Sequence, residues 1–177
     1  MDAAELLLVG IEVSVAFAGF AGVIATFQFR GAARIDRGDV VGLTMIVSFG
    51  LWSAFFSTLP LILSIFEIEP ENIWVICSGI GTIYMSYTMY FNYKSMKGVV
   101  VSLTARLLFG TAQGIAALLI LSMILNASDS VFHKEPGPYL ASIFYGLCLV
   151  GYMFVRLLLR PLWKAVRAQE APSPSEA

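Results

Sequence analysis

Five long apolar stretches dominate this chain, and each is about as long as a helix must be to cross a bilayer. A transmembrane helix requires roughly 20 mostly apolar residues. The stretches cover residues 4–29, 40–66, 73–91, 99–125 and 139–163. Because lipid offers no hydrogen bonds to an unpaired backbone, spanning segments of this kind fold as helices. The sequence therefore predicts an all-α fold, a polytopic transmembrane helical bundle with about five spanning helices.

The composition excludes several other classes of protein. Hydrophobic residues make up 58% of the chain and charged residues 13%, whereas soluble domains carry roughly 25% charged residues. This chain therefore lacks the polar surface that a soluble enzyme needs. The net charge of −1 also argues against binding nucleic acid, which requires a basic surface. The expected environment and first partner is the lipid bilayer.

The connections between the apolar stretches are too short to hold a separate soluble domain. We therefore expect a single bundle over residues 1–168. The acidic start, MDAAE, lacks the positive region of a signal peptide, so the first stretch is expected to stay as a spanning helix. Residues 169–177 read QEAPSPSEA, a polar segment with prolines that predicts a disordered cytoplasmic tail.

The basic residues are distributed unevenly along the chain. If the first connection lies inside the cell, every lysine and arginine except Lys134 falls at the inner side of the membrane. Acidic residues then gather on the outer side. Under the positive-inside rule this bias predicts an N-terminus outside and a C-terminus inside. The expected location is a plasma membrane, most simply a bacterial inner membrane, with several passes.

An acidic residue, Glu12, lies well inside the first apolar stretch. Glu5, Glu12, Gly19 and Thr26 recur every seven residues, so they lie roughly on one side of a helix. An unpaired carboxylate in lipid is costly, so we expect Glu12 to face protein, to pair, or to be protonated. Glu12 and Thr26 are candidates for an ion or proton pathway. The alternative is a protonated acid that only bonds a neighbouring helix.

The fourth stretch carries a central amide, Gln113, which is a natural partner for Glu12. Gly110 and Gly114 lie four residues apart on the same stretch. That spacing is typical of close helix approach in membranes. Gln113 is thus a pathway candidate, and Gly19, Gly110 and Gly114 are candidate packing positions. Helix packing explains the polar amide equally well.

Hydroxyl side chains follow helical spacing in the second and third stretches. Ser57 lies in the second stretch near Pro60, which is expected to kink the helix or free a carbonyl because it has no amide hydrogen. Thr82 lies in the third between Ser78 and Ser86, four residues from each. Ser57 and Thr82 are further pathway candidates. Hydrogen bonds between helices are the alternative explanation.

A basic collar is expected at the inner end of the last stretch. Its long side chains can reach the headgroup region, and contact with anionic lipid is the ordinary interpretation. Recognition of an anionic ligand or partner is the alternative. The collar consists of Arg156, Arg160, Lys164 and Arg167.

Asn126-Ala-Ser128 formally matches the glycosylation sequon. It falls on the predicted outer side, close to the membrane. That position makes it a poor acceptor.

Catalytic, metal-binding and cofactor signatures are missing from the sequence. It contains no G-x-S-x-G, H-E-x-x-H, P-loop or C-x-x-C motif, and His133 is its single histidine. We therefore expect no enzyme activity, metal or cofactor.

The leading hypothesis is a self-associating, non-enzymatic protein of channel or ion-transport type, because polar groups inside a membrane serve function or packing. The alternative is an accessory, scaffold or sensor subunit of a larger membrane complex.

Overall fold

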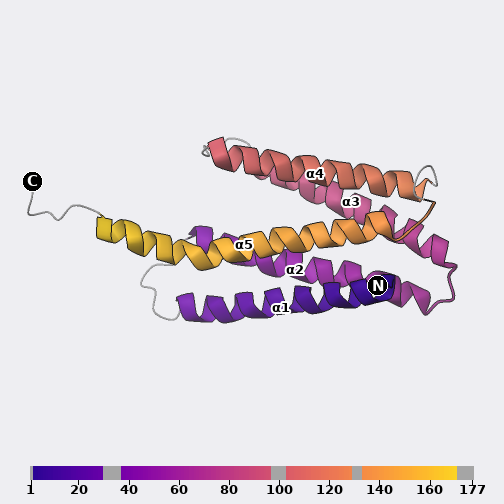
Figure 1. Cartoon of the computed structure of the whole chain (residues 1–177), viewed down its shortest axis with the longest axis horizontal. Helices are drawn as coiled ribbons and strands as arrows, with labels where there is room; N and C mark the ends of the chain where they lie inside the picture. Colours follow the sequence, from indigo (N-terminus) through magenta and orange to yellow (C-terminus); the bar gives the residue numbers. More distant parts are fainter. Residues whose placement is uncertain (1, 30–36, 97–102, 129–132, 171–177) are drawn as a thin grey trace, which may run out of the picture. The chain divides into compact units, whose positions relative to one another are not determined.

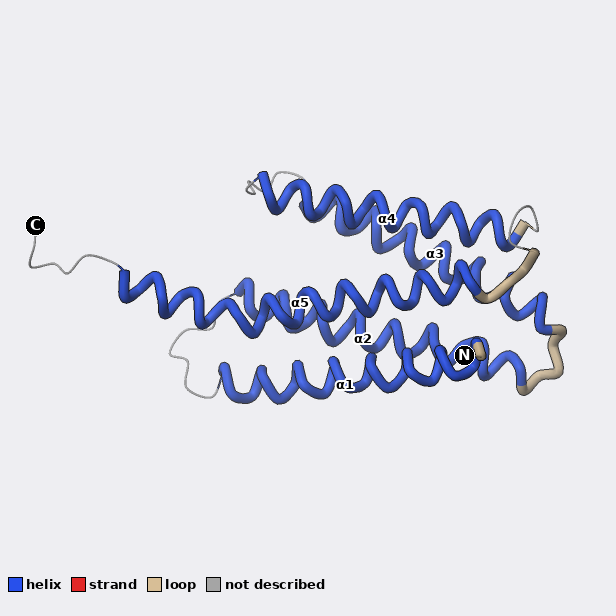
Figure 2. The backbone as a smooth tube through the Cα atoms, viewed as in Figure 1, coloured by secondary structure: helices blue, strands red, loops and turns tan. Residues whose placement is uncertain are grey.

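The structure is a computed structural model of the chain and describes residues 2–29, 37–96, 103–128 and 133–170. Within these ranges the chain forms helices joined by turns and contains no strand (Figures 1 and 2). The helices are α1 (Ala3–Phe29), α2 (Arg37–Ser64), α3 (Pro70–Met96), α4 (Leu103–Ala127) and α5 (Gly137–Glu170). The predicted all-α fold with five helices is confirmed.

Four of the five helices are long and apolar enough to cross a membrane. The candidate spans are Ala3–Thr26, Gly42–Ser64, Arg106–Ala127 and Gly137–Leu159. Helix α3 is long enough but falls outside this set, because its glycine, serine, threonine, asparagine and tyrosine residues lower its mean hydropathy. The number of passes and the orientation of the termini stay predictions.

Helix α3 begins with clear local signals. Pro70 occupies its first position, where a missing amide hydrogen costs nothing. The Glu69 carbonyl accepts hydrogen bonds from the amides of Asn72 (2.9 Å) and Ile73 (3.2 Å). Glu71 places a negative charge in the first turn, where it complements the helix dipole. These signals begin the helix three residues before the apolar stretch predicted at residue 73.

Helix α5 continues well past the end of its apolar span. It includes Gln169 and Glu170, the first two residues of the expected disordered tail. The rest of that tail, residues 171–177, lies outside the described part of the chain. The same holds for residues 99–102, where the fourth helix was expected to begin.

The chain divides into two compact units. Unit 1 combines Met1–Ile11 with Phe55–Tyr145, and unit 2 combines Glu12–Ala54 with Gly146–Ala177. Each unit is described by itself below.

Unit 1 contains α3, α4 and the adjoining parts of α1, α2 and α5. Helices α3 and α4 pack side by side (Figure 1). A β-carbon added at Gly81 of α3 would lie 3.4 Å from both Met123 Sδ of α4 and Tyr139 Cε2 of α5. The rings of Phe56 on α2 and Tyr84 on α3 have centroids 5.0 Å apart. These contacts join helices that are distant in sequence into one core.

Unit 2 is built from the remaining parts of α1, α2 and α5. Its core is a cluster of the buried residues Ala21, Ile46, Val150 and Leu157. A small residue permits close approach of two helices, since a β-carbon at Gly50 of α2 would lie 3.3 Å from the Ser14 carbonyl oxygen of α1. This unit therefore packs apolar side chains and backbone closely together.

Candidate functional site

A proline and a tyrosine on different helices form the centre of the polar arrangement in unit 1. Pro60 lies inside α2 and has no amide hydrogen for the carbonyl four residues earlier, which belongs to Phe56. The hydroxyl of Tyr139 on α5 donates a 2.7 Å hydrogen bond to that carbonyl oxygen. Pro60 was expected to kink the helix or to free a carbonyl. The structure bears on the second of these expectations, because the Phe56 carbonyl accepts a hydrogen bond from another helix.

Tyr139 is almost completely buried, with 1% of its surface exposed. Its ring lies 6.2 Å from that of Trp74, measured between centroids. Tyr139 therefore joins the beginning of α5 to both α2 and α3.

Asn126, near the end of α4, is the most buried amide of the described residues. Its Nδ2 donates to Ser78 Oγ of α3 (3.3 Å) and to the Glu135 carbonyl oxygen before α5 (2.9 Å). The side chain has no exposed surface. It is therefore no accessible acceptor for glycosylation, although the sequon is formally complete.

Two further hydrogen bonds link helices in unit 1. Gln113 of α4 donates from Nε2 to the Met89 carbonyl oxygen of α3 (3.2 Å). The hydroxyl of Tyr145 on α5 donates to the Ala112 carbonyl oxygen of α4 (2.6 Å). The Gln113 amide considered above as a partner for Glu12 is thus used between α3 and α4.

Three buried side-chain oxygens of unit 1 have no hydrogen-bond partner among the described residues. They are Ser57 Oγ on α2, Thr82 Oγ1 on α3 and Asn126 Oδ1 on α4. Buried polar groups normally find a partner, because leaving one unsatisfied is unfavourable. We use the name polar core for the following set of unit 1 residues: Ser57, Ser78, Thr82, Asn126 and Tyr139.

The predicted pathway residues are divided between the two units. Ser57, Thr82 and Gln113 belong to unit 1, whereas Glu12 and Thr26 belong to unit 2. Glu12 and Thr26 are both exposed on the surface of α1. The Thr26 hydroxyl donates to the Gly22 carbonyl oxygen of its own helix (3.0 Å). Of the five candidates, Ser57 and Thr82 join the polar core.

The three glycines singled out as packing positions face open space in this chain. A β-carbon added at Gly19, Gly110 or Gly114 would meet no atom of another helix or side chain within 4 Å in the described structure. All three lie on exposed faces. Among the described residues of its own unit, no neighbour packs closely against any of these glycines, so their role in packing stays a prediction.

The described part of the basic collar is limited to its first residue. Arg156 is exposed on α5. Helix α5 extends through positions 160, 164 and 167. The side chains of Arg160, Lys164 and Arg167 lie outside the described structure.

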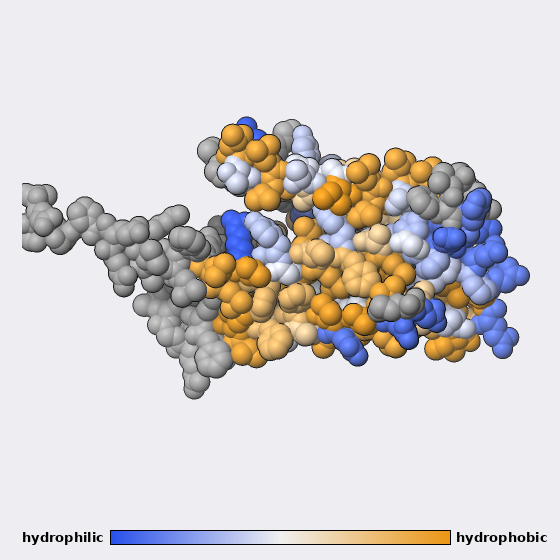
Figure 3. Space-filling view, viewed as in Figure 1, coloured by the Kyte–Doolittle hydropathy of each residue, from blue (hydrophilic) through white to orange (hydrophobic). Residues whose placement is uncertain are grey.

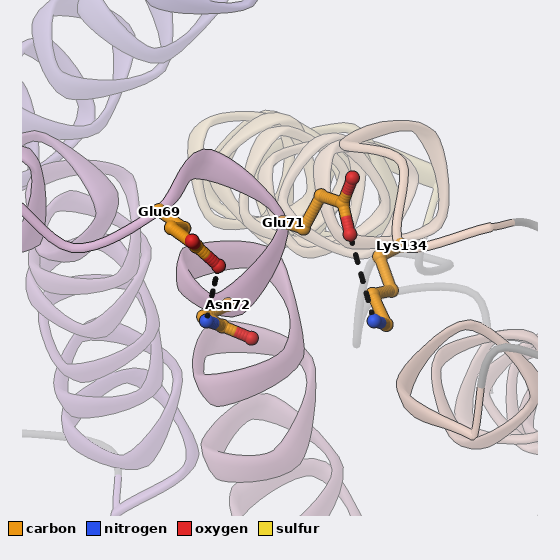
Figure 4. A network of polar contacts seen from close by, with 4 residues as sticks. All are labelled: Glu69, Glu71, Asn72 and Lys134. Atoms are coloured by element: carbon orange, nitrogen blue, oxygen red, sulfur yellow. Dashed lines mark hydrogen bonds and ion pairs between the residues drawn. The ribbon is translucent and has the colours of Figure 1, made fainter.

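Charged groups of unit 1 gather around the connections between α2 and α3 and between α4 and α5. In Figure 3 hydrophilic residues are concentrated there, while apolar residues follow the helices. Lys134 Nζ lies 3.5 Å from Glu71 Oε2, and Asn72 Nδ2 donates to Glu69 Oε2 at 3.2 Å (Figure 4). Exposed pairs of this kind contribute little stability.

Apolar side chains cover the exposed faces of the helices. Examples with more than 60% of their surface exposed are Phe20, Ile83, Leu107 and Leu118. No charged side chain is buried in the described part of the chain, and no three potential metal-ligating side chains come together there. Helices that are long enough to span a membrane and carry apolar side chains on their exposed faces are typical of a helical membrane protein. The fold and the candidate site define this class of protein.

Comparisons with known proteins add no narrower assignment. No protein-family model matches the chain, and comparisons with curated proteins and with solved structures found no match.

Sequence reasoning missed the roles of Tyr139 and Asn126. The position of Tyr139 at the start of an apolar stretch is typical of an aromatic anchor at a helix end, which does not point to its buried hydrogen bond. The signal for it was Pro60, which predicts a free carbonyl at Phe56 but does not say which helix supplies the donor. Asn126 carried a weaker signal, namely an amide at the end of an apolar stretch.

Proposed function

We propose that the protein is a non-enzymatic integral membrane protein of channel or transport type that works as a homo-oligomer. In this proposal the polar core of unit 1 holds a small polar solute or ion on its way through the protein. The observation that carries the proposal is the set of three buried oxygens without a partner, on α2, α3 and α4.

The energetic argument starts from the cost of those oxygens. A buried polar atom without a hydrogen bond costs about 1–3 kcal/mol, and apolar side chains at the same positions avoid that cost. A bound ligand that donates hydrogen bonds, or a cation that oxygen atoms coordinate, offsets it. Polar groups kept inside a membrane protein commonly mark such a pathway.

The chemistry of the polar core narrows the class of ligand. The unpartnered atoms are two hydroxyl oxygens and one amide oxygen, and the buried side chains of unit 1 carry no formal charge. A site without a cation gives an anion nothing to pair with. A small monovalent cation or a neutral hydrogen-bonding solute fits it better.

Flux into liposomes tests the proposal. The full-length protein is reconstituted, and potassium, sodium and proton fluxes are followed with ion-sensitive dyes, with glycerol uptake as the neutral case. We expect Thr82→Val and Ser57→Ala to reduce the flux of one solute at least five-fold. Thr111→Val is the matched control, because Thr111 is exposed and its hydroxyl bonds the Leu108 carbonyl of its own helix.

Two results would contradict the proposal. One is flux of all four solutes at the level of empty liposomes, with the reconstituted protein shown to be folded. The other is a solute flux that Thr82→Val and Ser57→Ala leave at the level of Thr111→Val.

An accessory subunit of a larger membrane complex is the second candidate, and a separate observation favours it. Gly110 and Gly114 form an open close-approach motif on an exposed face of α4, which a partner helix would fit. Gentle solubilisation from native membranes followed by measurement of particle mass distinguishes the two. A particle composed of this chain alone supports the homo-oligomer, and a mixed particle supports the accessory role.

A further inference from the structure

An exposed acid on the membrane-spanning part of α1 is the feature of unit 2 that most needs an explanation. Glu12 lies within the candidate span Ala3–Thr26, and its side chain is exposed. Within the described part of the chain its carboxyl group has no hydrogen-bond or ion-pair partner. An acid that faces acyl chains without a partner is costly, so something outside the chain is expected to cover it.

The residues around Glu12 form a continuous exposed face in unit 2. Glu12, Ala16, Gly19, Val23 and Thr26 are all exposed, and their spacing of three, four and seven residues puts them on one side of α1. The opposite side is buried through Ser14 and Ala21. We call this exposed set the α1 face.

The α1 face has room for another helix to approach closely. A β-carbon at Gly19 would meet nothing within 4 Å in the described structure, and Ala16 has the smallest side chain after glycine. Small residues allow helix backbones to come near one another in lipid, where packing and hydrogen bonds replace the hydrophobic effect.

The position of Arg156, the cationic side chain that the structure describes in unit 2, argues against a salt bridge across this face. In unit 2 a β-carbon at Gly151 of α5 would lie 3.4 Å from Phe17 Cζ of α1, so these two positions share one level. Arg156 follows Gly151 by five residues and is level with residue 22 of α1. It is therefore about 15 Å further along the bundle than Glu12, at 1.5 Å per residue. Two copies that are inserted in the same direction keep that offset, so Arg156 of one copy does not reach the level of Glu12 in the other.

We propose that a second copy of this chain docks on the α1 face, with the two Glu12 carboxyl groups paired across a twofold axis. Two carboxylic acids that face one another exchange two O–H···O hydrogen bonds and leave no charge in the lipid. A twofold interface is self-complementary, because each copy presents the same patch. One patch with a donor, an acceptor and open small residues thus supplies both halves of the contact.

This inference rests on the self-association proposed above but not on solute passage. Cysteine cross-linking of the full-length protein in liposomes tests it, in a background with Cys77→Ala and Cys148→Ala. Gly19→Cys places a thiol at the centre of the α1 face. Val155→Cys is the matched control, because Val155 is exposed on α5 of the same unit and lies at nearly the same level as Gly19.

We expect oxidation to link Gly19→Cys into dimers at least five-fold more efficiently than Val155→Cys. Adding Glu12→Gln is expected to preserve most of that yield, since paired amides make the same two hydrogen bonds. Adding Glu12→Leu is expected to lower the yield at least five-fold. Because Glu12 is exposed, Glu12→Leu is expected to leave the fold intact, and circular dichroism with thermal melting checks this directly.

Several outcomes would overturn the inference. Equal linking at Gly19→Cys and Val155→Cys removes the preference for this face, and an unchanged yield with Glu12→Leu removes the carboxyl pair. Linking in native membranes to a different protein, with none between copies, assigns the face to another partner. Dimers through Gly19→Cys without solute flux leave this inference standing and refute only the proposed passage.

Discussion

The two units of this chain hold their helices together by different means. In unit 1, hydrogen bonds from Gln113, Asn126, Tyr139 and Tyr145 connect neighbouring helices. In unit 2, a cluster of apolar side chains fills the core. Lipid is as apolar as leucine, so helices in a membrane associate through close packing and hydrogen bonds. Unit 2 also buries the polar residues Ser14 and Ser53. The buried side-chain oxygens without a hydrogen-bond partner among the described residues, however, all belong to unit 1, and we therefore expect a function beyond folding in its polar core.

Removing packing from unit 2 is expected to give the largest loss of stability. Ile46 is fully buried in the apolar cluster, and Ile46→Ala leaves a cavity that should lower the free energy of unfolding by about 2–5 kcal/mol. Denaturation in bicelles or mixed micelles measures the change. Ile83→Ala is the control, because 73% of the Ile83 surface is exposed. If both variants lose the same stability, the cluster does not hold unit 2 together.

Removing the buried amide from unit 1 should give a somewhat smaller loss. Asn126→Leu takes away the donor to Ser78 Oγ and to the Glu135 carbonyl oxygen. Leaving these acceptors unsatisfied is expected to cost roughly 1–3 kcal/mol in the same unfolding measurement. Asn72→Leu changes an exposed amide and should be nearly neutral. A variant Asn126→Leu that is more stable than the original chain would mean that packing alone explains unit 1 as well.

The bond between Tyr139 and the Phe56 carbonyl offers a sharper test. Tyr139→Phe removes the hydroxyl donor and should cost about 1 kcal/mol of unfolding free energy. Pro60→Ala restores an amide hydrogen four residues after Phe56, so the carbonyl regains a partner within α2.

A double-mutant cycle of these two changes measures their coupling. We expect Tyr139→Phe to cost less in the Pro60→Ala background than in the original chain. Tyr87→Phe, at an exposed tyrosine, is the control. Additive effects of Tyr139→Phe and Pro60→Ala would show that the tyrosine does not compensate for the proline.

The helical architecture was predictable from sequence because long apolar stretches leave a backbone in lipid no alternative to the helix. The five helices lie where those stretches predicted them, and capping signals such as Pro70 shift the ends by a few residues. The orientation of the termini and the single-bundle domain stay predictions. The site was less predictable, because apolarity on all sides of a helix does not reveal which side faces a neighbour.

Glu12 and Tyr139 illustrate that difficulty. The sequence leads us to expect that Glu12 faces protein, pairs or is protonated, and within this chain it lies on an exposed face of α1, so that expectation stays a prediction. A tyrosine at the start of an apolar stretch is typical of an anchor at the headgroup level, yet Tyr139 is 1% exposed. Both depend on which helices are neighbours, and that information is contained in packing across the chain and not in local spacing.

The smallest expected effect concerns the glycines of α4, and it extends the comparison from cores to surfaces. Gly110→Leu should change the free energy of unfolding by less than about 0.5 kcal/mol, because surface positions without special contacts tolerate substitution and a β-carbon there meets nothing within 4 Å in the described structure. Gly50→Leu is the contrasting variant, since its β-carbon would lie 3.3 Å from the Ser14 carbonyl oxygen and overpacking costs about 1–3 kcal/mol. Unfolding of both variants in the same detergent measures the difference.

A Gly110→Leu variant that is as unstable as Gly50→Leu would place a helix of the same chain against α4. A stable Gly110→Leu variant with an altered particle mass in native membranes would instead assign this face to a contact between molecules.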